Sequence, residues 1–218
     1  MVVTAIVMVL LLSCGLVLVD GDTIPHRPVP WLAIGLTGLA VVGIVLQAVW
    51  HGAMAALDAD PARTGWWRHG TAVFLQNGGP AGVVFNLVSL AAVAALAQWA
   101  WGRRWFVGLV AAAIVVPPLV GATFGGAPHD DPSTFAGSSG LTFFLAGTFA
   151  GALVFRGRSA SDRALGVGAV AAAVVAWVWL SDAHGLVAAE GALVGALVAG
   201  LSSARASTPA RSVSRSAG

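Results

Sequence analysis

Two residues of this sequence, Ser139 and His184, have side chains that could together carry out nucleophilic hydrolysis. Ser139 lies in Gly137-Ser138-Ser139-Gly140 at the start of a long apolar run, where a hydroxyl group needs a reason to be present. A serine becomes nucleophilic when a base removes its proton, and a neutral imidazole near pH 7 suits that transfer. We therefore predict Ser139 as the nucleophile and His184 as its general base. The alternatives are a serine that caps a helix and a histidine that is hydrated at a helix end.

The composition predicts that these two residues belong to an all-α integral membrane protein. Hydrophobic residues make up 58% of the chain and charged residues 9%, whereas soluble domains carry about 25% charged residues. The 11 basic residues are all arginines and form no stripe with interleaved aromatic residues, so we expect no nucleic-acid partner. We also expect no cofactor and no metal, because no glycine loop suits phosphate and no His/Cys/Asp/Glu cluster has metal-ligand spacing. One cysteine, Cys14, excludes an intrachain disulfide.

Seven apolar runs are about long enough to cross a bilayer, which takes about 20 residues for a helix. They are residues 2–19, 31–50, 81–101, 105–123, 137–155, 164–180 and 185–201. Pro117 and Pro118 predict that the fourth helix is kinked or ends early. Residues 202–218, which are rich in Ser, Ala and Arg, are predicted to be disordered.

The arginines predict the orientation of these seven helices. Nine of them fall in segments that lie on one side of the membrane if the spans alternate. They are Arg27, Arg103, Arg104, Arg156, Arg158, Arg163, Arg205, Arg211 and Arg215. By the positive-inside rule that side is the cytoplasm, so we expect a plasma-membrane protein with its N-terminus outside and its C-terminus in the cytoplasm. Ser139 and His184 then begin helices that both enter from the outside, at a similar depth.

Small residues predict that these two helices touch, because membrane helices approach closely where side chains are small. On the helix of Ser139 they are Ala146, Gly147, Ala150 and Gly151. On the helix of His184 they are Ala188, Gly191 and Gly195.

With these motifs the chain resembles the rhomboid family of intramembrane serine proteases. Gly137-Ser138-Ser139-Gly140 is similar to the family's nucleophile motif, and Ala183-His184 followed by Gly191 is similar to its catalytic-histidine helix. Trp66-Trp67-Arg68 resembles the loop after the first core helix, the segment 77–87 resembles the start of the second, and Gln98 and Gly102 stand in place of a Glu-x-x-x-Gly turn. The resemblance implies a six-helix core over residues 31–201, with residues 1–30 as an extra N-terminal transmembrane helix and loop. It also implies a serine endopeptidase that cleaves transmembrane segments of membrane protein substrates through a Ser-His dyad.

The resemblance also implies which groups hold the oxyanion. Asn86 matches the family's asparagine, and the backbone amide of Ser139 would be the second donor. The family usually has histidines at the positions of Asn77 and Gly82, so a donor is missing at Gly82, and Gln76 or Asn77 could replace it. Phe143 stands where the family places an aromatic ring near the histidine.

Two acidic residues near His184 have expectations of their own. Asp182 could orient the imidazole, although an acid at this position is more often solvated. Glu190 lies within a membrane span, so we expect it to be protonated, hydrogen-bonded and structural.

Two other functions remain open at this point. A catalytically weak or inactive rhomboid-like protein that binds membrane helices is favoured by Gly82 and Gln98. A small transporter would need more intramembrane polar residues and often an internal repeat.

Overall fold

The computed structural model describes residues 2–60, 62–124 and 136–206, and in this part of the chain every regular element is a helix. The long helices are α1 (Val2–Val19), α2 (Trp31–Val49), α5 (Gly79–Phe124), α6 (Ser139–Arg156), α7 (Ala160–Leu180) and α8 (Ala183–Ala206). The short ones are η1 (Gly21–His26), α3 (Ala53–Leu57) and α4 (Arg68–Ala72). Six of the described helices are long and apolar enough to cross a membrane. The predicted all-α integral membrane protein is therefore confirmed in its class.

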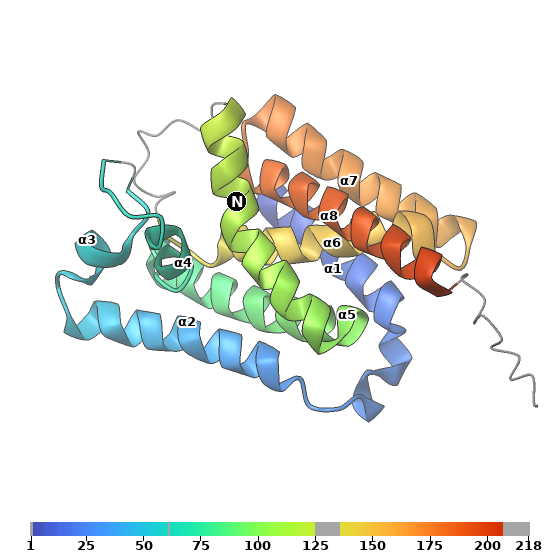
Figure 1. The fold of residues 1–218 in the computed structure, drawn as a ribbon, viewed down its shortest axis with the longest axis horizontal. Helices are drawn as coiled ribbons and strands as arrows, with labels where there is room; N and C mark the ends of the chain where they lie inside the picture. The colour runs from blue at the N-terminus through green and yellow to red at the C-terminus, as the bar shows by residue number, and fades with distance from the viewer. Residues whose placement is uncertain (1, 61, 125–135, 207–218) are drawn as a thin grey trace, which may run out of the picture.

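Helix α5 contains two of the predicted spans and changes direction sharply between them (Figure 1). The break is at Gly102, whose φ of 75° and ψ of 166° are far from helical values, so the predicted turn is present. Gln98, one turn before it, accepts a hydrogen bond from the backbone N–H of Ala33 at the start of α2 (3.0 Å). This contact satisfies one of the N–H groups that a helix start leaves without an intrahelical partner.

The proline pair does not end the helix that follows this break. Pro117 and Pro118 lie inside α5, which continues to Phe124, and the non-helical backbone within α5 is at Gly102. A proline ring holds φ near the helical value, and membrane helices tolerate the lost N–H because nearby groups satisfy the freed carbonyls. The predicted early end at the prolines is therefore wrong.

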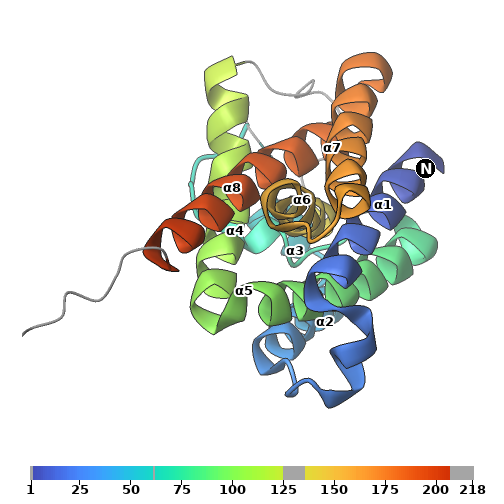
Figure 2. The ribbon, with the colours of Figure 1, turned by 90° about the vertical axis from the view of Figure 1, so that its right-hand side faces the viewer.

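Helix α6 is the centre of the molecule. Viewed end-on it is surrounded by α1, α5, α7 and α8 (Figure 2). Every residue from Leu141 to Leu153 is buried. An apolar helix enclosed by other helices can place a polar group at its end in a position fixed by packing, and Ser139 is the first residue of this helix.

The contact between α6 and α8 is the most extensive helix pair of the fold, and it depends on glycine. A side-chain carbon at Gly147 would overlap the carbonyl of Ala188, and one at Gly151 would overlap that of Ala192. Conversely, Gly191 faces the Phe144 carbonyl and Gly195 faces that of Thr148 with no room for a side chain. The prediction that small residues bring the helices of Ser139 and His184 together is therefore confirmed.

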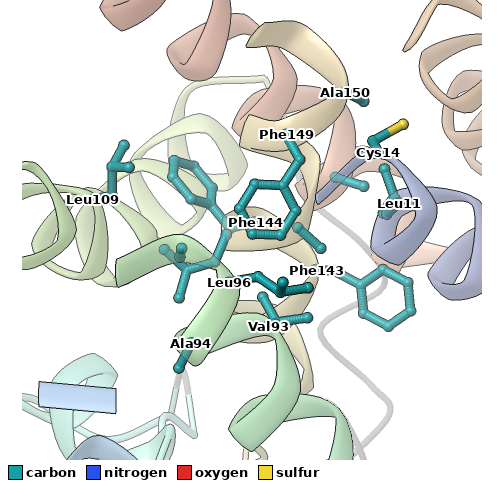
Figure 3. Close-up of a cluster of buried hydrophobic side chains, with 14 of the residues drawn as sticks. Leu11, Cys14, Val93, Ala94, Leu96, Leu109, Phe143, Phe144, Phe149 and Ala150 are labelled. Carbon is teal, nitrogen blue, oxygen red and sulfur yellow. The ribbon is translucent and has the colours of Figure 1, made fainter. Parts of the chain in front are cut away.

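Helix α1 packs into the same hydrophobic core as the other helices. Leu11 and Cys14 of α1 lie with Phe149 and Ala150 of α6 and with residues of α5 (Figure 3). Leu11 is 1% exposed and Cys14 is fully buried. The N-terminal helix is therefore a part of the bundle rather than an anchor beside it.

Segments that the arginine pattern assigns to one side do lie together. Arg158, before α7, pairs with Asp20, after α1 (3.7 Å), and Thr4 and Asp182 meet at the other end of the bundle (3.0 Å).

Helix α8 continues to Ala206, so it includes the first five residues of the segment expected to be disordered. The rest of that segment, 207–218, lies outside the described residues.

Candidate active site

Ser139 and His184 are in hydrogen-bond contact. The Oγ atom of Ser139 lies 3.1 Å from Nε2 of His184. Ser139 begins α6, and His184 is the second residue of α8, so both sit at the same end of the tightly packed helix pair. The predicted proximity is confirmed, and a distance of about 3 Å is what direct proton transfer requires.

Asp182 holds the other side of the imidazole. Its Oδ1 atom lies 2.8 Å from His184 Nδ1 and also accepts from the backbone N–H of His184 (3.0 Å). The hydrogen bond from the His184 side chain is the largest cause that lowers the pKa of Asp182 to about 2, so the carboxylate is ionised at neutral pH. An ionised carboxylate can only accept, so Nδ1 carries the proton and Nε2 presents its lone pair to the Ser139 hydroxyl. Of the two expectations for Asp182, the structure supports the orienting position over a merely solvated one.

The ring of Phe143 packs against the imidazole. The two ring centroids are 4.8 Å apart with an interplanar angle of 49°, and Phe143 is completely buried. The aromatic contact that the resemblance implied is therefore present, and it limits rotation of His184 on the side away from solvent.

A small space beside Gly137, with room for about one carbon atom, is bordered by Ser139 and Asn86, the predicted nucleophile and oxyanion donors. A point placed where a side-chain carbon of Gly137 would be lies 3.7 Å from Ser139 Oγ, 3.9 Å from Asn86 Nδ2 and 4.0 Å from the Ser139 backbone nitrogen. Gly137 has a φ of 146°, which strains any other residue. Glycine therefore permits this turn, and its missing side chain leaves room for about one atom beside Ser139 and Asn86.

Polar side chains beside this space form a partly buried network. Asn86 Nδ2 donates to Gln76 Oε1 (2.7 Å), and Gln76 Nε2 donates to Ser138 Oγ (3.1 Å). The backbone of Gln76 is itself held by Gln47, which accepts from its N–H (2.7 Å) and donates to its carbonyl (2.9 Å). This network orients the Asn86 amide. It also engages the amide group of Gln76, which is one of the two residues predicted as alternative oxyanion donors.

Ser138 and Glu190 differ from what their positions in the sequence indicate. Ser138 occupies the N-cap position of α6 but makes no side-chain cap bond; its hydroxyl accepts from Gln76 instead. Within the described residues, neither carboxyl oxygen of Glu190 has a hydrogen-bond partner, so the expected hydrogen bond is absent. The physical reason is that the surrounding helices satisfy their backbone groups internally and offer it mainly apolar contacts.

The pair is partly open to solvent. The side chain of His184 is 34% exposed. Trp66 and Trp67, which precede α4, are exposed, and Arg68 at the start of α4 is fixed by the carboxylate of Asp58 (3.5 Å) and by the Trp67 ring. A cavity of the structure lies instead at the opposite end of the helices, between Trp101, Arg156 and Arg158. Neither Ser139 nor His184 lines this cavity.

Sequence reasoning missed Thr4 and Gln47 as parts of this site. Thr4 Oγ1 donates to Asp182 Oδ2 (3.0 Å) across 178 positions of sequence. Both residues lie in apolar runs with no local motif, so no signal in the sequence could have found them.

The sequence matches no protein-family model and no curated protein sequence.

Proposed function

We propose that this chain is an intramembrane serine endopeptidase of the rhomboid type, which cleaves transmembrane segments of other membrane proteins. The observation that carries the proposal is the 3.1 Å contact between Ser139 Oγ and His184 Nε2, with Nδ1 held by Asp182. Nucleophilic catalysis uses a serine, an imidazole in a fixed tautomer and a carboxylate in contact with one another. A membrane protein has few other reasons to bring these three groups together in one partly solvated cluster.

The chemistry follows from these positions. Ser139 Oγ attacks the peptide carbonyl carbon while His184 Nε2 takes the hydroxyl proton, and the carbonyl becomes an oxyanion. The Asn86 amide and the Ser139 backbone N–H donate to that oxyanion in the space beside Gly137. His184 then delivers its proton to the leaving amine as the C–N bond breaks, and an acyl-enzyme remains on Ser139. Water, deprotonated by His184, hydrolyses the ester and restores the serine.

The membrane arrangement completes the proposal. Because Gly102 divides α5 into two halves, each the length of a span, we propose seven crossings, with α2 to α8 forming a six-helix core. The arginine pattern supports an N-terminus outside and a C-terminus in the cytoplasm of a plasma membrane. The serine and histidine then act near the outer face on membrane protein substrates.

A catalytically weak or inactive helix-binding protein is the second candidate. It is favoured by Gly82, which supplies no donor, and by the Asn86 amide, which already donates to Gln76. The retained contact between Ser139 and His184 favours the enzyme.

A fluorophosphonate probe separates the two candidates. It reacts covalently with an activated serine, so the purified wild-type protein should be labelled at Ser139. Labelling should disappear in Ser139→Ala and fall to background in His184→Ala. Absence of labelling in the folded wild-type protein, or labelling that persists in Ser139→Ala, would contradict the proposed enzyme.

A further inference from the structure

The N-terminal helix reaches the candidate active site at its first turn. Thr4 Oγ1 donates to Asp182 Oδ2 (3.0 Å), whereas His184 is bound to the other oxygen, Oδ1. With the backbone N–H of His184 also on Oδ1, the carboxylate has partners on both oxygens. Its plane is therefore fixed from two directions, by α8 and by α1.

The segment that carries Asp182 lies between two long helices. It is the short connection between α7 and α8, and the preceding residue, Ser181, has a left-handed backbone conformation (φ 52°). Backbone hydrogen bonds hold this connection, from the Asp182 N–H to the Ala176 carbonyl (3.0 Å) and from the Gly185 N–H to the Asp182 carbonyl (2.9 Å), but they do not involve the carboxylate. The hydroxyl of Thr4 supplies the contact from outside α7 and α8.

The position of α1 is fixed well enough for this role. It packs against α5, α6 and α7, and Gly15 lies so close to the Phe149 ring that a methyl group there would be 2.7 Å from it. Cys14 and Leu11 are buried in the common core (Figure 3). Packing along the helix thus determines where Thr4 stands at its end.

We propose that Asp182 and Thr4 are positioning residues: Asp182 keeps the proton of His184 on Nδ1, and Thr4 of α1 holds Asp182 in place. Helix α1 is then a component of the active site and not only a membrane anchor. The effect of these two residues on the rate of hydrolysis rests on the proposed function, whereas their effect on the imidazole tautomer rests on the geometry alone.

The test uses full-length protein in detergent micelles and the rate of fluorophosphonate labelling at Ser139. Thr4→Val removes the hydroxyl at nearly constant shape and should lower the rate about five- to tenfold, less than the full loss of one hydrogen bond to a charged group, because Thr4 acts on Ser139 only through Asp182 and His184. Thr4→Ser keeps the hydroxyl and should recover most of that loss. The matched control is Thr37→Val, because the Thr37 hydroxyl donates within its own helix to Ala33 (2.9 Å).

A double-mutant cycle distinguishes positioning from general packing. Asp182→Asn should lower the rate about 10² or more, since the amide can favour the wrong tautomer. If Thr4 acts through Asp182, Thr4→Val should cause no further loss in the Asp182→Asn background. Additive losses in the double variant, or a Thr4→Val protein that matches Thr37→Val, would overturn the role of Thr4.

A second measurement does not depend on activity. In protein labelled with ¹⁵N-histidine, with the His184 signal assigned by its loss in His184→Ala, the wild type should show the Nδ1–H tautomer. Asp182→Asn should show a mixture of tautomers, and Thr4→Val should shift partly towards it. A wild-type protein with this tautomer but no labelling would contradict the hydrolase, whereas an unchanged tautomer in both variants would contradict the positioning role.

Discussion

Ser139 Oγ lies 3.1 Å from His184 Nε2, although 45 positions of sequence and an entire helix separate the two residues. The distance follows from the contact between α6 and α8, in which glycines on each helix face backbone carbonyls of the other. Two helices that meet backbone to backbone have little freedom to slide, so the side chains at their ends are held in register.

Gly191→Ala should therefore weaken both the fold and the site. Its new methyl group would overlap the carbonyl of Phe144, so the helices must separate, at a cost of about 1–3 kcal/mol. A displacement of about 1 Å at the reacting groups can lower the rate about 10²-fold. Thermal unfolding and probe labelling measure the two effects. The control is Gly200→Ala, on an exposed part of α8 with open space around it, and equal labelling of the two variants would contradict the prediction.

Asn86→Ala should lower kcat for cleavage about 10²-fold with little change in KM. The Asn86 amide borders the space beside Gly137, where the oxyanion would form, so its contribution should appear in the transition state. Steady-state cleavage of a reporter transmembrane segment gives both constants. Ser89→Ala is the control, because Ser89, also on α5, donates only to carbonyls of its own helix. A raised KM with unchanged kcat would show that Asn86 binds the substrate instead.

Gly82→His should increase kcat about tenfold. Residues 82 and 86 are one turn apart on α5 and share a face, and a side-chain carbon at Gly82 meets open space. A histidine there could add a second side-chain donor to the oxyanion, and an imperfectly placed donor should recover part of the 10²–10³ that a full one contributes. Gly82→Ala adds only a methyl group and serves as the reference. If the histidine variant is no faster than the alanine variant, a donor at this position does not limit the rate.

The contribution of Asp182 to stability should persist to low pH. The pKa of Asp182 is about 2, lowered from 3.8 chiefly by the hydrogen bond from His184, so this carboxylate is ionised from pH 8 down to pH 4. Its contribution to folding is complete above pH 3.8 and is lost only as the pH falls through about 2. The difference in Tm between the wild type and Asp182→Asn should therefore be present at pH 4 and should shrink as the pH falls towards 2. A difference that has already vanished at pH 4 would contradict the low pKa of Asp182.

The fold was largely predictable because each long helix is indicated by the hydrophobicity of many residues together and not by any single one. Runs of about 20 apolar residues identified the long helices, and Gly102 marked the turn within α5. A local signal that failed was the proline pair in α5, because fixed φ angles are compatible with a helix whose other contacts are satisfied. Ser139 and His184 were also predictable as neighbours, since each lies at the start of a helix that small residues bring to its partner, whereas the place of Phe143 was implied only by the family resemblance.

The sequence by itself determined a bundle of apolar helices, its arginine asymmetry, and the pairing of one hydroxyl with one imidazole near a common surface. Only the tertiary structure decided that Asp182 faces Nδ1, that Thr4 of α1 holds that carboxylate, and that Gln76 engages Ser138 and Asn86. The physical reason is one of scale. Hydrophobic burial is non-directional and survives errors of several residues, whereas a hydrogen bond needs two atoms from distant helices to meet within about 3 Å at a suitable angle.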